Sequence, residues 1–149
     1  AFEVARALEE RGASFFGLAS VDEAVLLRRQ GIRSPLLILN AILEPEIAAV
    51  LDYTLTQTVC TEESARHLNQ EAADRKKKIP VHVKVDTGMG RLGIWYEEAV
   101  ALTRYVQTCD HLFLEGLYTH LANADDAEPD GIKQDVGAVL RALSTREPR

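Results

Sequence analysis

The stretch VHVKVDTGMGRLG, from Val81 to Gly93, decides how the rest of the chain is interpreted. Valine alternates with polar residues in its first half, so a strand here has one apolar face and one face that carries His82, Lys84 and Asp86. Polar side chains on a covered face of a sheet are costly unless they are paired or functional. Arg91 follows between three glycines, which allow tight bends and close approach of a ligand. The stretch predicts that Lys84 and Arg91 line a site for a small anionic ligand.

The rest of the chain alternates between helical periodicity and short apolar runs. Ser20 and Thr61 are suited to cap helices, and Gly12 and Gly31 are placed to end them. The pattern predicts strands at 15–19, 35–39, 55–59, 81–85 and 113–119, and helices at 2–11, 20–31, 45–53, 61–77, 97–107 and 132–143. One helix followed by five strand–helix units implies parallel strands joined by right-handed crossovers.

Two α/β architectures fit this order of elements. A complete (β/α)8 TIM barrel needs about 250 residues, or about 31 per unit, so five units in 149 residues match that density and leave three strands unaccounted for. A complete open sheet of the flavodoxin-like type is the alternative. The chain opens without methionine inside a helical pattern and closes on the polar segment STREPR, so both ends resemble cuts. We therefore expect a partial (β/α)8 TIM barrel with about five parallel strands.

Polar residues follow two neighbouring strands of this predicted sheet. The first group runs from Lys84 to Arg91, and the second ends at His120. Because ligands bind at the carboxyl ends of parallel strands in α/β proteins, His120 is in position to contact a ligand bound by the first group. Asp86 is expected to cap the loop or to pair with a nearby cation. His82 is expected to be a satisfied or half-exposed structural histidine.

Residues 88–93 also match the pattern G-x-G-x-x-G of dinucleotide-binding folds. In that fingerprint the first glycine follows the strand directly and a helix begins within the motif. Here Asp86 and Thr87 intervene, and the predicted helix begins only near Glu97. The acidic residue expected about 20 positions later at a strand end is missing, since Glu115 falls in the middle of a strand. Nucleotide binding is therefore disfavoured.

Composition and charge argue against a nucleic-acid-binding protein, a membrane protein and a metal-binding protein. The net charge of −6 gives no support to a nucleic-acid surface. The sequence contains no run of about 18 apolar residues, so we expect no membrane span, and we also expect no secretory signal. Cys60 and Cys109 match no metal spacing and are expected to be free thiols in a reducing compartment, the cytoplasm. Asp125 and Asp126 have no histidine or cysteine at suitable spacing, so we expect a solvated loop and no metal site.

Three segments of the sequence resemble the alanine racemase family. They are VKVDTGMGRLG at 83–93, EGLYTHLANAD at 115–125, and the opening EVARALEERGASFFGLASVDEAVLLRRQGI at 3–32. The resemblance implies that residues 1–149 are a fragment of the N-terminal barrel domain, containing strands 2 to 6, and that the C-terminal β domain is absent. It also implies the cofactor pyridoxal 5'-phosphate (PLP), the racemisation of L- and D-alanine for cell-wall peptidoglycan, and a homodimer in the full-length protein.

The same resemblance assigns roles to three residues. Arg91 matches the arginine that contacts the substrate carboxylate and the phenolic oxygen of the cofactor, and His120 matches the histidine that lies against the cofactor ring. Lys84 matches a lysine that is often carbamylated and then orients the arginine. Carbamylation requires an uncharged amine, which burial favours. The family's Schiff-base lysine would lie just before Ala1, so the fragment alone is predicted to be inactive.

A non-catalytic PLP-binding barrel protein is the alternative function. Proteins of that class are not expected to carry the carboxylate clamp that Arg91 would provide, so the DTGMGRLG loop at 86–93 favours the racemase. A nucleotide-binding domain is the third hypothesis, and it requires a helix that begins at Gly90 rather than near Glu97.

Overall fold

The computed structural model describes residues 1–122, 137 and 140. Within them the elements are α1 (Phe2–Glu9), β1 (Phe16–Leu18), α2 (Val21–Arg29), β2 (Leu36–Ala41), α3 (Ile47–Asp52), β3 (Thr56–Val59), α4 (Glu62–Asp74), β4 (Ile79–Asp86), β5 (Ile94–Trp95), α5 (Ala99–Thr108) and β6 (Leu112–Thr119). Short 3-10 turns at Glu44–Glu46 and Tyr96–Glu98 lead into α3 and α5. Apart from residues 137 and 140, the predicted helix at 132–143 lies outside the described part, as do Asp125 and Asp126.

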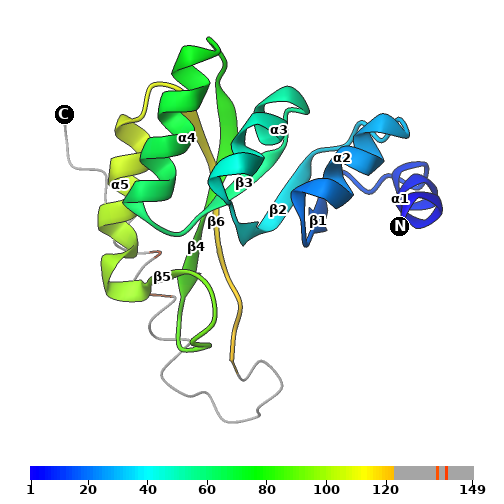
Figure 1. Ribbon diagram of the computed structural model, residues 1–149. Helices are drawn as coiled ribbons and strands as arrows, with labels where there is room; N and C mark the ends of the chain where they lie inside the picture. Colours follow the sequence, from blue (N-terminus) through cyan, green and yellow to red (C-terminus); the bar gives the residue numbers. More distant parts are fainter. Residues whose placement is uncertain (123–136, 138–139, 141–149) are drawn as a thin grey trace.

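The strands form one parallel sheet whose order follows the chain. β1 pairs with β2, β2 with β3, β3 with β4, and β6 pairs with β4. An open flavodoxin-like sheet would place its first strand between the second and the third, so that alternative is wrong. Sequential order is that of an arc of a (β/α)8 barrel. Helices α4 and α5 lie along the same side of the sheet in Figure 1, as right-handed crossovers between sequential strands require.

Within the described residues, the structure contains one strand that the sequence pattern did not predict. The two-residue strand β5 pairs with the end of β4, with Val85 opposite Ile94. Val85 also pairs with Thr119 of β6. Since a strand residue has one neighbour on each side, β5 must lie on the edge of β4 that faces β3. The glycine-rich loop that carries Arg91 therefore folds back toward the carboxyl ends of β3 and β2.

Helix boundaries follow the predicted caps at the start but not always at the end. Ser20 and Thr61 are the N-caps of α2 and α4, and the side-chain oxygen of each accepts a hydrogen bond from a backbone N–H three residues later. By contrast, α4 ends at Asp74 rather than near residue 77. Lys76 has a left-handed φ of 54°, which turns the chain away from the helix axis. The basic run 76–78 therefore follows the helix and does not form its last turn.

The sheet has one apolar face and one polar face. Val81, Val83 and Val85 of β4 are at most 2% exposed and belong to the hydrophobic core that the helices cover. The predicted alternation of β4 is thus confirmed. The opposite face carries polar side chains from three strands that contact one another: Thr56, Thr58, His82, Lys84, Glu115 and Tyr118.

Candidate active site

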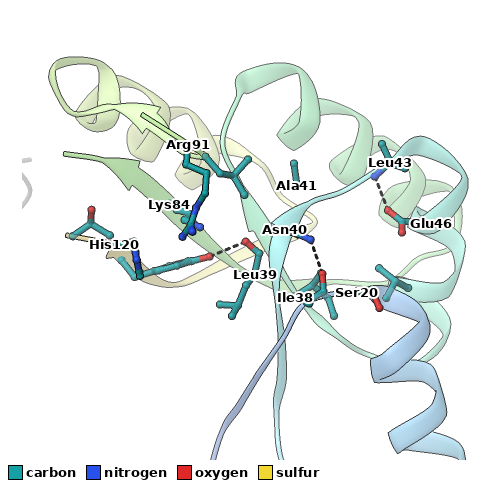
Figure 2. Close-up of a pocket in the computed structure, with 15 residues that line it drawn as sticks. Ser20, Ile38, Leu39, Asn40, Ala41, Leu43, Glu46, Lys84, Arg91 and His120 are labelled. Carbon is teal, nitrogen blue, oxygen red and sulfur yellow. Dashed lines mark hydrogen bonds between the residues drawn. The ribbon is translucent and has the colours of Figure 1, made fainter. Parts of the chain in front are cut away.

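A cavity of about 940 Å³ opens at the carboxyl ends of the strands (Figure 2). The three predicted site residues Lys84, Arg91 and His120 all line this cavity. In Figure 2 the side chain of Arg91 extends into it on the side where Lys84 lies. This is the end of a parallel sheet at which α/β proteins bind their ligands. The structure therefore brings together residues that stand 36 positions apart along the chain, from 84 to 120.

Asp86 holds the loop that carries Arg91. Its Oδ1 atom accepts hydrogen bonds from the backbone N–H groups of Gly88 at 3.0 Å and of Gly90 at 3.1 Å. Partial burial acts to raise the pKa of Asp86, but hydrogen bonds from the backbone of Gly90, Gly88, Met89 and Arg91 outweigh it and hold the pKa below its ordinary value. The predicted role of Asp86 as a cap of the loop is confirmed.

Gly93 allows the loop to return to β4. It has a φ of 139°, and a β-carbon built on it would lie 2.6 Å from the backbone nitrogen of Asp86 and 2.8 Å from the carbonyl carbon of Val85. No L-residue with a side chain fits such an approach without backbone movement. Gly88 and Gly90 also have positive φ angles, of 115° and 66°. The local sequence is therefore required by the path of the loop.

Lys84 is buried, and no charged side chain among the described residues pairs with it. Its side chain lies on the polar face of β4, and the residue is only 6% exposed. No hydrogen bond or ion pair connects it to any of the described residues. Its Nζ atom lies over the ring of Tyr118, at 5.4 Å from the ring centroid. A buried amine without a carboxylate partner is costly unless it is neutral, modified or bound to an anion.

Tyr118 fixes the floor of the cavity beside Lys84. Its hydroxyl lies 2.8 Å from Oγ1 of Thr58 and donates a hydrogen bond to the carbonyl oxygen of Leu39 at 3.3 Å. Burial raises the pKa of Tyr118, the hydrogen bond with Thr58 partly offsets this, and the nearby Cys60 raises it further. The hydroxyl therefore stays protonated at neutral pH and keeps both partners.

His82 and Glu115 form a second polar group on the same face. Nε2 of His82 lies 3.1 Å from Oε2 of Glu115, and Oγ1 of Thr56 donates to the same carboxylate oxygen at 3.4 Å. The register between β4 and β6 shifts at this point: Val81 pairs with Leu114, but the next residue, His82, pairs with Gly116. Glu115 is therefore an additional residue in β6, and both Glu115 and Gly116 lie beside His82. His82 is satisfied by this contact, as predicted for a structural histidine.

His120 is exposed at the mouth of the cavity, where it follows the last residue of β6. The side-chain hydroxyl of the preceding Thr119 forms a hydrogen bond with the hydroxyl of Thr87, with 2.9 Å between the two Oγ1 atoms. This hydrogen bond joins the end of β6 to the start of the glycine loop. The imidazole of His120 has no hydrogen-bond partner among residues 1–122. The position thus leaves its ring free to contact a ligand.

The sequence interpretation missed Tyr118, Thr58 and Leu39. The strand alternation contained a signal for Tyr118, because a residue two positions before His120 on a strand shares its face. No comparable signal identified Thr58 and Leu39, because their contacts with Tyr118 join strands that are 60 and 79 residues away along the chain. Such contacts depend on the register between strands rather than on a local pattern.

The positive charges of Lys84 and Arg91 favour the binding of an anion at their end of the cavity. Neither Lys84 nor the side chain of Arg91 is paired with a carboxylate among the described residues. The acidic side chain that lines the cavity, Glu46, lies across from Arg91 in Figure 2 and accepts a hydrogen bond from the backbone of Leu43 at 2.8 Å. In the part of the chain that the structure describes, no three His, Cys, Asp or Glu side chains are grouped to bind a metal ion. None of the helices described there is long and apolar enough to cross a membrane.

Comparison with protein families gives one match that covers the chain. The model of the alanine racemase N-terminal domain matches residues 1–148. The alanine racemase of Geobacter sulfurreducens is 39% identical over 129 residues, which cover 87% of this chain and 34% of the relative. That of Symbiobacterium thermophilum is 42% identical over 126 residues, which cover 85% of this chain and 33% of the relative. The chain spans about a third of the length of these relatives.

Two solved structures of similar shape are racemases. Alanine racemase from Clostridium difficile in complex with cycloserine superposes with a TM-score of 0.87 at 30% identity, covering 96% of this chain and 39% of that chain. A histidine racemase from Leuconostoc mesenteroides superposes with a TM-score of 0.82 at 28% identity, covering 99% and 40%. The described sheet is therefore part of a TIM barrel of the alanine racemase type, and the chain belongs to the alanine racemase family through its N-terminal domain.

Proposed function

We propose that this chain supplies the carboxylate-binding side of the active site of a PLP-dependent alanine racemase, which interconverts L- and D-alanine. The observation that supports this most directly is the convergence of Lys84 and Arg91 in one cavity, where neither has a carboxylate partner among the described residues. We propose further that residues 1–149 correspond to strands 2 to 6 of the barrel and that the C-terminal β domain lies outside them.

The residues of the cavity fit PLP. The cofactor is an anion with a phenolic oxygen and an aromatic ring, and the guanidinium of Arg91 and the exposed imidazole of His120, which both line the cavity, suit these groups. Arg91 would bind the phenolic oxygen, and His120 would lie against the ring. When bound, PLP supplies an electron sink for the bond that racemisation breaks at Cα.

Arg91 would also orient the substrate. The guanidinium presents a planar fork of donors that can bind a carboxylate with two parallel hydrogen bonds. A carboxylate held in this way fixes the direction of the Cα–H bond, so that a base can remove the proton from one face and return one to the other. The anchoring of the loop by Asp86 supports this role, because it restricts the position of the arginine.

Lys84 would act as a carbamate. Its amine is buried and has no hydrogen-bond or ion-pair partner in the described part of the chain, and reaction with carbon dioxide would turn a buried cation into an anion. That anion would pair with Arg91 and hold the guanidinium in the orientation that binds the substrate. In this role Lys84 positions Arg91 and does not itself move a proton.

The chain alone is expected to be inactive. Racemisation on PLP needs a lysine that carries the cofactor, and the described lysines do not suit this role. The run 76–78 precedes β4 and therefore lies at the end of the sheet opposite the cavity, whereas Lys84 has the role given above. The complete protein is expected to act as a homodimer in the cytoplasm, where its D-alanine would supply peptidoglycan synthesis.

A racemisation assay tests the proposal. The complete protein is loaded with PLP and given L-alanine, D-alanine formation is measured, and the 149-residue chain is assayed beside it. We expect turnover by the complete protein and none by the chain. L-Histidine serves as the competing substrate, because a histidine racemase is among the structural neighbours. A complete protein that binds PLP but forms neither D-amino acid would instead be a non-catalytic PLP-binding barrel.

A further inference from the structure

Tyr118 is fixed across the polar face of the sheet by its hydroxyl group. Its ring comes from β6, whereas the hydroxyl is bonded to Thr58 of β3 at 2.8 Å and to the carbonyl oxygen of Leu39 of β2 at 3.3 Å. The side chain thus reaches from β6 past β4 to the two strands beyond. Its ring cannot leave this position without the loss of both hydrogen bonds.

The amine of Lys84 lies over the face of the Tyr118 ring. Nζ lies 5.4 Å from the ring centroid, and the face of an aromatic ring attracts an ammonium group within about 6 Å. The nearby thiol offers no negative charge, because burial raises the pKa of Cys60 to about 11 although the charge of Lys84 acts to lower it. The ring of Tyr118, and not the thiol of Cys60, therefore favours the positive form of Lys84.

The same ring face disfavours a negative group. A carbamate at Lys84 would carry its charge on two oxygens, which the electron-rich face of Tyr118 repels. Arg91 has the opposite effect, because a guanidinium attracts a carbamate and repels an ammonium. Lys84 therefore lies between one group that stabilises its cation and one that stabilises its anion.

We propose that Tyr118 is a positioning residue that sets the balance between the ammonium and the carbamate forms of Lys84. The proposal rests on the carbamate that the proposed function assigns to Lys84. In the exchange the ammonium leaves the ring and releases one proton to solvent. The free electron pair of nitrogen then forms a bond to the carbon of dissolved carbon dioxide, one C=O bond becomes C–O⁻, and nitrogen releases a second proton. The carbamate so formed pairs with Arg91.

Carbon-13 NMR of the 149-residue chain in carbon-13-labelled bicarbonate measures the ratio of the carbamate to the ammonium form of Lys84. Lys84 gives a carbamate signal that the variant Lys84→Arg removes, whereas a carbamate on the amino group of Ala1 remains and serves as an internal reference. Tyr118→Leu removes the ring face, and we expect it to raise the ratio of carbamate to ammonium at Lys84 roughly 2- to 30-fold at a fixed bicarbonate concentration, the range for loss of a cation–π contact. Tyr118→Phe keeps the ring face and is expected to change the occupancy less than Tyr118→Leu does.

A second substitution keeps the test informative if Tyr118→Leu fails to fold. Replacement of Tyr118 by trifluorophenylalanine keeps the shape of Tyr118→Phe but withdraws electron density from the ring face. We expect higher carbamate occupancy in the fluorinated chain than in Tyr118→Phe. Equal or lower occupancy overturns the role of Tyr118 and leaves the carbamate of Lys84 intact. If no Lys84 carbamate forms in any of these chains, both the role of Tyr118 and the carbamate of the proposed function are refuted.

Discussion

Gly93 lies against the backbone of Asp86, so closely that a β-carbon at residue 93 would come within 2.6 Å of the Asp86 nitrogen. This approach lets the glycine loop return to β4 and start β5. Backbone atoms cannot move aside as the end of a side chain can. The position of Arg91 therefore depends on the absence of a side chain two residues later.

Gly93→Ala is expected to lower the free energy of unfolding by about 2–4 kcal/mol, because the strain of a positive φ adds to the clash with Asp86. Gly90→Ala is the matched control in the same loop. It also has a positive φ, but no atom lies within 4 Å of its added β-carbon, so a loss of about 1–2 kcal/mol is expected. Urea unfolding followed by circular dichroism measures both variants. Equal losses would show that the contact with Asp86 has no effect of its own.

Asp86 should make stability depend on pH in the acid range. Its pKa is lowered in the folded chain, so the unfolded chain binds the proton first as the pH falls. Its contribution is therefore fully present above the unfolded value and is lost as the pH falls through the folded value. Urea midpoints measured between about pH 6 and 3 should fall less in Asp86→Asn than in the unchanged chain.

Glu9 provides the control for that measurement. Its pKa is also lowered, chiefly by the side-chain and backbone hydrogen bonds of Ser34, whose Oγ lies 2.6 Å and whose N lies 2.7 Å from Oε1. Glu9 joins α1 to the segment before β2, far from the glycine loop along the chain. Glu9→Gln should flatten the pH dependence of global stability but leave the hydrogen exchange of the Gly88 and Gly90 amides unchanged. An increase in that exchange would mean that the two sites are coupled.

The sequence predicted those features of the site that depend on local pattern. The period of two in β4 placed Lys84 on the polar face, and the glycines around Arg91 indicated a bend. It could not predict the pairing of β5 with β4, because two residues carry no recognisable strand pattern. The contact of Lys84 with Tyr118 also depends on the register of β4 and β6, which pairs these two residues directly.

Gly116 makes room for the ring of His82, and this can be tested by a pair of substitutions. A β-carbon at residue 116 would lie 2.7 Å from Cε1 and 2.8 Å from Nδ1 of His82, so Gly116→Ala should displace the ring and weaken its contact with Glu115. A loss of about 1–3 kcal/mol is expected. In the background His82→Ala the same substitution should cost less. A double-mutant cycle without a coupling energy would contradict this explanation.

Arg91→Lys tests the most specific chemical claim about the cavity. A lysine keeps the positive charge but loses the planar fork, so the substrate carboxylate would be attracted without being oriented. In the complete enzyme we expect kcat/KM for L-alanine to fall roughly 100-fold or more, since a small error in orientation has an effect of that size. Arg104→Lys is the matched control, because Arg104 is exposed on α5 and is outside the cavity. If KM rises while kcat is unchanged, Arg91 contributes attraction alone, and the orienting role assigned to it is wrong.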